Sequence, residues 1–161
     1  MKNFGYKACH MLEALRYILI FIGVFVAECY QSPQEQFAII TLFFIVSLAG
    51  LTGIEGYFLG KYASGIVGYR DPGPYQKQSA INNLALTITT IIAYLLNWGL
   101  HAQLALISVL MIFLLLSSLN HALDAIKNGN KSLRNFLRPI GSILLILTVL
   151  HYMLPIITTN P

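Results

Sequence analysis

The sequence predicts an all-α membrane protein, one domain built as a bundle of five transmembrane helices. Of its 161 residues, 57% are hydrophobic and 10% are charged, and the mean hydropathy is +0.69. In an ordinary soluble domain about a quarter of the residues are charged. Five apolar runs each approach the ~20 residues that a helix needs to cross a bilayer. They are 11–29, 36–60, 80–98, 102–126 and 137–157.

The basic residues predict how this bundle is oriented. All ten Lys and Arg residues lie in or beside the segments on one side of the five runs. Because cytoplasmic segments carry the excess of Lys and Arg, we expect a cytoplasmic N-terminus and an external C-terminus. Charges that flank apolar spans also predict membrane lipids as partners and no nucleic acid. They are Lys2, Lys7, Arg16, Lys61, Arg70, Lys77, Lys127, Lys131, Arg134 and Arg138.

The first run follows a basic start, as the apolar part of a signal peptide would. Glu28, Cys29 and Tyr30 at its end make a poor cleavage site, so we expect 11–29 to be kept as the first span. Cys9 and Cys29 are separated on this helix by roughly 30 Å, which excludes a disulfide between them.

The second run has two contrasting faces. One face carries small residues, which let helix backbones approach closely. The opposite face is polar and includes a carboxylate. Neighbours on both faces predict a central position for this helix. The small residues are Ala49, Gly53, Gly56 and Gly60, and the polar residues opposite them are Thr41, Thr52 and Glu55.

Glycine and proline are concentrated between the second and third runs. Gly65, Gly68, Pro72 and Gly73 in the segment 61–79 predict a long cytoplasmic loop there instead of a helix. The connection between the third and fourth runs is very short. These two runs should therefore form an antiparallel hairpin.

Polar side chains form stripes on the third and fourth runs. At 100° per residue, the polar residues of each run share one face, which should be turned toward protein. The fifth run, 137–157, is largely apolar and would serve as a packing surface. The stripes comprise Asn83, Thr87, Thr90, Tyr94 and Asn97 on the third run, and Ser117, Asn120, His121 and Asp124 on the fourth.

Four polar residues stand at a common depth. Glu13, Glu55, Asn83 and His121 each lie six residues inside a lysine, which is roughly 9 Å along a helix. We therefore expect one polar layer that opens toward the cytoplasm. Arg16 lies one turn deeper than Glu13 and needs an anion, which Glu13 or Glu55 could supply.

These side chains admit both functional and structural interpretations. A carboxylate inside a span often marks a proton or cation site, but Glu55 paired with Arg16 would only orient two helices. His121 and Asp124 could form half of a metal site, a proton relay or merely the polar end of a helix. A metal would need a third ligand, which only Glu13 or Glu55 could provide. We expect no metal and no other cofactor.

The segment 66–84 reads IVGYRDPGPYQKQSAINNL. It resembles the signature of an uncharacterised family of small bacterial multi-pass membrane proteins: Ile-Gly-Trp, four residues, Pro-Phe-Gln, an acidic residue two positions on, and Asn-Leu opening the next span. The matching residues are Gly68, Pro74, Gln76, Asn83 and Leu84, while Tyr69, Tyr75 and Gln78 replace Trp, Phe and the acidic residue.

The resemblance implies a multi-pass protein of the bacterial inner (plasma) membrane, with His121 as the counterpart of a histidine late in the following span. It implies no activity, because that family has none assigned. The loop residues that the resemblance singles out are Gly68, Tyr69, Pro74, Tyr75 and Gln76.

Three classes of function stay open at this stage. The first is a membrane protein whose polar layer binds a small molecule, lipid headgroup or ion, or that serves as a subunit of a membrane complex. The second is a small proton-coupled, homo-oligomeric transporter, although no internal repeat is visible. The candidate residues of the polar layer are Glu13, Arg16, Glu55, Asn83, Asn120, His121 and Asp124.

The third class is an intramembrane enzyme that modifies lipids, an isomerase or a hydrolase. Glu55 and His121 would then act as the acid and base pair. The sequence contains no nucleophile elbow, phosphate-binding loop, haem-attachment motif or zinc-protease helix. Catalysis therefore ranks below transport, and transport ranks below binding or a structural role.

Overall fold

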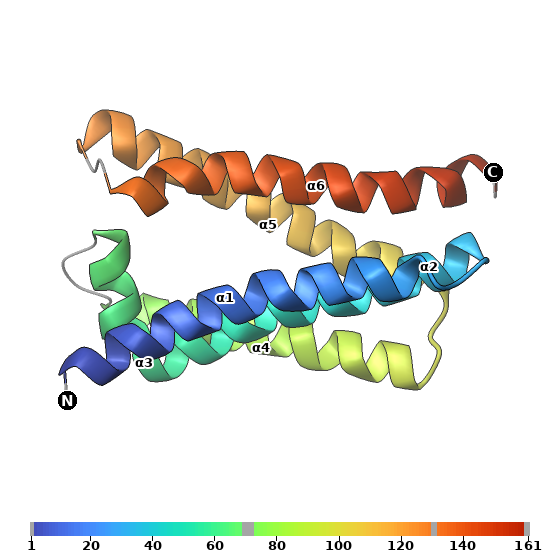
Figure 1. The fold of residues 1–161 in the computed structure, drawn as a ribbon, viewed down its shortest axis with the longest axis horizontal. Coiled ribbons are helices and arrows are strands. Elements are labelled where there is room, and N and C mark those ends of the chain that lie inside the picture. The colour runs from blue at the N-terminus through green and yellow to red at the C-terminus, as the bar shows by residue number, and fades with distance from the viewer. Residues whose placement is uncertain (1, 69–72, 130–131, 160–161) are drawn as a thin grey trace.

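All regular structure in this protein is helical within the described residues, which in the computed structural model are 2–68, 73–129 and 132–159. The all-α class with five long helical segments is therefore confirmed. In chain order, the elements are α1 (Lys2–Ala27), α2 (Pro33–Ile45), the π-helical turn η1 (Val46–Gly50), α3 (Leu51–Val67), α4 (Gly73–Leu95), α5 (Leu100–Lys127) and α6 (Leu133–Thr159) (Figure 1). The elements α2, η1 and α3 follow one another without a break.

The prediction of a long loop at 61–79 is wrong, because most of that segment is helical. Helix α3 continues to Val67 and ends at Gly68, whose φ of 92° is a left-handed conformation that glycine adopts without strain. Helix α4 already begins at Gly73, and Pro74 stands in its first turn, where a missing N–H leaves no bond unmade. Tyr69, Arg70 and Pro72 lie outside the described residues.

Four helical segments are long and apolar enough to cross a membrane in the described part of the chain. They are Phe4–Ala27, Pro33–Val67, Leu100–Lys127 and Leu137–Thr158. Large apolar side chains cover the outside of the bundle, among them Phe21, Leu116 and Leu154, each more than half exposed. A soluble protein rarely exposes so much apolar surface. The fold therefore fits a membrane protein.

The helices form two arms that meet at one end. The first arm contains α1, α3 and α4, the second contains α5 and α6, and α2 packs against members of both. The core at this joined end is fully buried and includes Phe37, Phe44, Ile107 and Ile156. From there α1 and α6 diverge toward the end that holds the N-terminus (Figure 1). We call that second end the open end.

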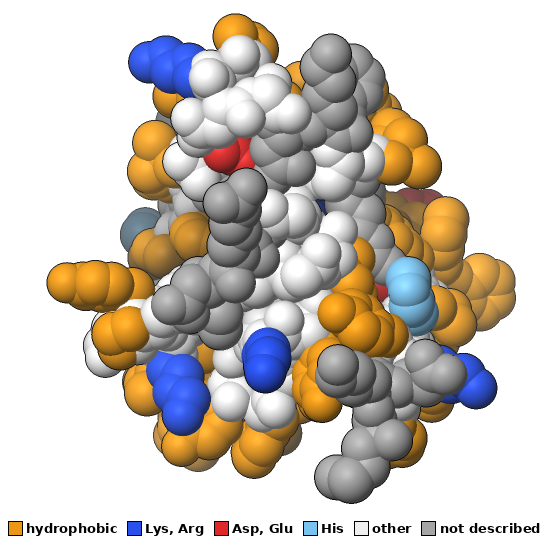
Figure 2. Space-filling view, turned by 90° about the vertical axis from the view of Figure 1, so that its left-hand side faces the viewer, with side chains coloured by type: hydrophobic (Ala, Val, Ile, Leu, Met, Phe, Trp, Pro, Cys, Tyr) orange, Lys and Arg blue, Asp and Glu red, His pale blue; other side chains and the backbone are white. Residues whose placement is uncertain are grey.

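The basic residues that the structure describes lie toward the open end. Helices α1, α4 and α6 begin there, and α3 and α5 end there (Figure 1). Lys7, Lys61, Lys77 and Lys127 stand within about two turns of these helix ends. Figure 2 looks onto this end and shows Lys and Arg side chains spread around it. The described Lys and Arg residues, which the sequence places on one side of the apolar runs, are therefore also gathered toward one end of the folded bundle.

Helices α3 and α4 approach closely because glycines of α3 meet side chains of α4. A Cβ atom on Gly53 would lie 2.7 Å from Cγ of Leu84 and 3.0 Å from the backbone oxygen of Ala80. One on Gly60 would lie 3.2 Å from the side chain of Gln76. The predicted small-residue face is thus the surface on which α4 packs.

The π-helical turn changes which residues belong to this face. A π-helical turn holds one more residue than an α-helical turn, so it rotates the residues before it relative to those after it. Within this turn Gly50 also meets α4, because the Cβ position of Gly50 lies 3.0 Å from Cγ2 of Thr87. Ala49, grouped with the glycines by the sequence pattern, instead lines a cavity between the two arms.

We predict opposite effects of alanine at two glycines. Gly53→Ala should lower the free energy of unfolding by about 1–3 kcal/mol, because its methyl group overlaps Leu84. Gly141→Ala should raise it by about 0.5–1 kcal/mol, because nothing lies within 4 Å of its Cβ position. Unfolding of both variants in mixed detergent micelles measures the difference. Equal effects would contradict the close α3–α4 contact.

Candidate functional site

A cavity of about 290 Å³ lies between the two arms. Its walls come from α1, from η1 and α3, and from α5 and α6. The wall contains charged and polar side chains together with a large apolar part. The polar and charged residues are Glu13, Arg16, Tyr17, Thr52, Glu55, Ser117, His121, Arg138 and Ser142.

An ion pair between Arg16 and Glu55 forms one wall of the cavity. An Nη2–H of Arg16 on α1 donates to Oε2 of Glu55 on α3, and the two side chains are only 12% and 9% exposed. Of the two anions that the sequence offered to Arg16, Glu55 makes this contact. Burying either charge alone would cost several kcal/mol. The pair therefore holds α1 and α3 in one register.

The guanidinium of Arg16 also has an unused donor. Its Nε–H is buried and has no hydrogen-bond partner among the described residues. Buried donors are nearly always paired, with protein or with a bound molecule. This N–H is therefore a buried, unsatisfied donor within the described part of the structure.

A second polar contact joins α5 to α6 on the opposite wall. Nη1 of Arg138 lies 3.0 Å from Nε2 of His121, whose side chain is buried. A guanidinium can only donate, so Nε2 is the acceptor and the imidazole is neutral in this arrangement. Arg138 did not enter the predicted polar layer. The reasoning applied to Arg16 would have found it, because an arginine just inside an apolar run needs an acceptor as well.

Asn83 does not reach the cavity, although it stands at the predicted depth. It is buried on the side of α4 that packs on α3. Thr87 and Thr90 of the same stripe donate to backbone oxygens of their own helix, at 2.9 and 2.8 Å. Tyr94 and Asn97 are exposed. Only Asn83, Thr87 and Thr90 of the stripe are thus buried within the bundle, and the stripe forms no continuous polar path among the described residues.

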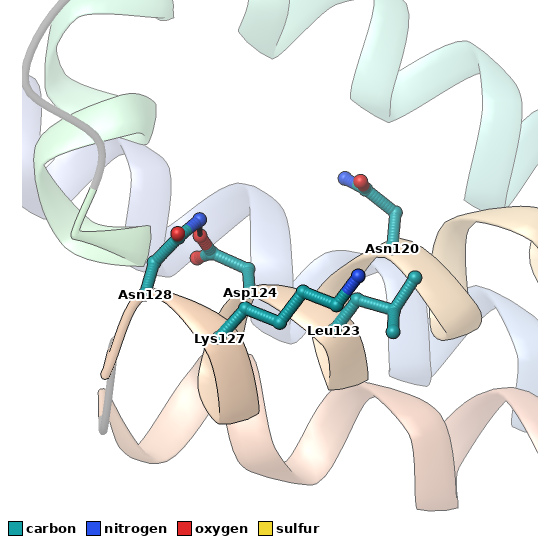
Figure 3. A pocket seen from close by; sticks show the side chains of 5 residues that line it. All are labelled: Asn120, Leu123, Asp124, Lys127 and Asn128. Carbon is teal, nitrogen blue, oxygen red and sulfur yellow. Dashed lines mark hydrogen bonds between the residues drawn. The ribbon is translucent and has the colours of Figure 1, made fainter.

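Asp124 and Asn120 lie in a separate, shallow hollow. The described residues that line it come from α5 and the position after it: Asn120, Leu123, Asp124, Lys127 and Asn128 (Figure 3). Oδ1 of Asp124 accepts a hydrogen bond of 2.7 Å from the side-chain amide of Asn128.

The single layer expected from depth is therefore divided among three places. Glu13, Arg16, Glu55 and His121 share the cavity, whereas Asn83 and the Asp124 hollow lie elsewhere. Among the described residues, no three His, Cys, Asp or Glu side chains come close enough to hold a metal ion.

Of the described residues of the loop motif, Gln76 fastens α4 to α3 by hydrogen bonds. The side-chain amide of Gln76 donates to the backbone oxygen of Gly60 at 3.2 Å and accepts from Oγ of Ser64 at 2.9 Å. Gly68 ends α3, Pro74 begins α4, and Tyr75 is 87% exposed. None of these residues lines the cavity, and Tyr69 lies outside the described residues. In this structure Gln76 makes a packing contact.

Comparison with known proteins gives a family but no activity. The sequence profile of a family of unknown function (DUF6790) matches residues 10–159. No curated protein and no solved structure matches the chain. The expected membership of an uncharacterised family is confirmed to this extent, while the bacterial source, the multi-pass arrangement and the loop signature stay predictions.

We predict that Glu55→Gln lowers the free energy of unfolding by about 3 kcal/mol, because it leaves the charge of Arg16 buried without its anion. The double variant Arg16→Gln with Glu55→Gln should regain more than half of that loss. Unfolding of the single and double variants in mixed micelles completes the thermodynamic cycle. Glu35→Gln, an exposed carboxylate on α2, is the control. An effect of Glu55→Gln no larger than that of Glu35→Gln would contradict the pair's role.

Proposed function

The chain belongs to this family of unknown function, and we propose that it is a multi-pass membrane protein that binds a small molecule, lipid headgroup or ion between its two arms. The observation that supports this most directly is the cavity of about 290 Å³ with Arg16 and Glu55 on one wall and His121 and Arg138 on the other. A mainly apolar hollow with a few converging polar groups is the usual form of a ligand site.

In this proposal all five long helices cross the membrane, α4 included. The low hydropathy of α4 comes partly from Asn83, Thr87 and Thr90, which are buried within the protein. Its exposed surface includes Ile88 and Leu95, which lipid would solvate well. The basic open end would face the cytoplasm of a bacterial cell, so the cavity would open inward.

The joined end favours binding over transport. Transport would require a path past Phe37, Phe44 and Ile107, which are fully buried there. Catalysis by Glu55 and His121 has less support still, because Glu55 is paired with Arg16 and His121 accepts from Arg138. A subunit of a membrane complex is compatible with the exposed apolar surface.

The proposed orientation predicts different reactivities for the two native cysteines. Cys29 is exposed at the joined end and Cys9 is buried near the open end. A membrane-impermeant maleimide should therefore label intact cells at Cys29, and Cys29→Ser should abolish the labelling. In that variant, Lys61→Cys should react only after the cells are permeabilised. Labelling of Lys61→Cys in intact cells would reverse the orientation.

A bulky side chain in the cavity should abolish ligand binding without unfolding the protein. Gly141 lines the cavity and has open space around its Cβ position, so Gly141→Phe should fill the cavity. Leu144→Phe, on the exposed surface of the same helix, is the matched control. Thermal unfolding would be measured with a panel of lipids, metabolites and ions.

A true ligand should raise the melting temperature of wild type and of Leu144→Phe by about 3 °C or more. The same ligand should leave the melting temperature of Gly141→Phe unchanged. If every stabilising compound acts equally on all three proteins, the cavity is not the binding site.

A further inference from the structure

The cavity changes from charged to apolar along its length. Glu13, Glu55 and Arg138 line the part nearer the open end of the bundle. Leu110 and Leu145 line the part nearer the joined end. A molecule that satisfies both parts must be amphipathic.

The cavity is too small for a whole membrane lipid and has an open rim. Its volume of about 290 Å³ lies at the lower end of ligand sites, which suits a headgroup and the first part of a chain. Tyr17 on α1 and Leu137 on α6 line the rim and are 53% and 50% exposed. Within the described residues, α1 and α6 make at most a slight backbone contact with each other, whereas both pack on α2. A hydrocarbon chain could leave between them into the bilayer.

Among the residues that the structure describes, the charges of the wall balance. Arg16 and Arg138 are cations, Glu13 and Glu55 are anions, and His121 is neutral where it accepts from Arg138. A purely anionic or purely cationic headgroup would leave one charge uncompensated in a region of low dielectric constant. A headgroup that carries one charge of each sign keeps the site neutral.

We infer, building on the proposed binding function, that the ligand is a zwitterionic phospholipid with a phosphate and a protonated amine. The phosphate accepts from the guanidinium groups of Arg16 and Arg138, which both line the cavity. The amine lies against the carboxylates of Glu13 and Glu55. The acyl chains extend between α1 and α6 into the membrane.

The test compares two lipids that differ in headgroup charge. Purified, delipidated full-length protein is mixed with phosphatidylethanolamine or with the anionic phosphatidylglycerol, both with the same acyl chains. Melting temperature and lipid retention in native mass spectrometry are measured. Phosphatidylethanolamine should raise the melting temperature by about 5 °C and phosphatidylglycerol by less than half of that. Equal shifts, or a larger shift with phosphatidylglycerol, would overturn the inference.

A charge variant should reverse the preference. Glu13→Gln leaves the wall with one net positive charge, so phosphatidylglycerol should become the better ligand. Glu35→Gln, remote from the cavity, should bind phosphatidylethanolamine better than phosphatidylglycerol, as wild type does. A site that is merely damaged would bind both lipids more weakly, without a change in which lipid is preferred. An unchanged preference in Glu13→Gln would therefore overturn the assignment of the amine to this carboxylate.

Two further measurements identify the source of the ligand and separate this inference from the proposed function. Free glycerophosphoethanolamine should give no shift, and a shift equal to that of the lipid would instead identify a soluble ligand. If neither lipid acts but another compound stabilises wild type and not Gly141→Phe, the cavity binds a ligand and only the lipid assignment fails. If every compound shifts the melting temperature of Gly141→Phe as much as that of wild type, both proposals fail.

Discussion

The burial of the charge on Arg16 is the constraint on which the rest of this structure depends. A guanidinium within an apolar helix is costly unless an anion meets it, and Glu55 does so from 39 residues further along the chain. This contact joins α1 to α3 and places both charges on the wall of the cavity. Packing alone would not require α1 and α3 to meet in this particular register. The same ion pair therefore serves the fold and shapes the candidate site.

Packing of α4 on α3 determines which polar groups reach the cavity. The glycines of α3 draw α4 close, and Gln76 fastens its first turns by hydrogen bonds to Gly60 and Ser64. Asn83, Thr87 and Thr90 of α4 are then buried within the bundle and do not line the cavity. Within the π-helical turn before α3, Gly50 meets Thr87 of α4 and Ala49 lines the cavity wall. A local change in helix geometry thus sets the lining of a site formed by distant segments.

The cavity exists because the two arms pack tightly at one end only. Phe37 and Phe44 fill the joined end, where Tyr152 on α6 also donates a hydrogen bond of 2.6 Å to Glu28. Toward the open end, His121 and Arg138 hold α5 and α6 together within one arm. At that end, Oγ of Ser132 donates to the backbone oxygen of Val67 at 2.9 Å and links the arms. Such an arrangement leaves room between the arms without separating them.

By itself, the sequence determined the all-α class, the five long helices and the grouping of basic residues at one end, because apolar length and charge order are read along the chain. It also identified Arg16 as a cation in need of an anion. Only the tertiary structure decided that His121 meets Arg138 in the cavity while Asn83, at the same depth, packs against α3. Counting residues gives depth along a helix, but the direction of a side chain around the bundle depends on which helices pack against it.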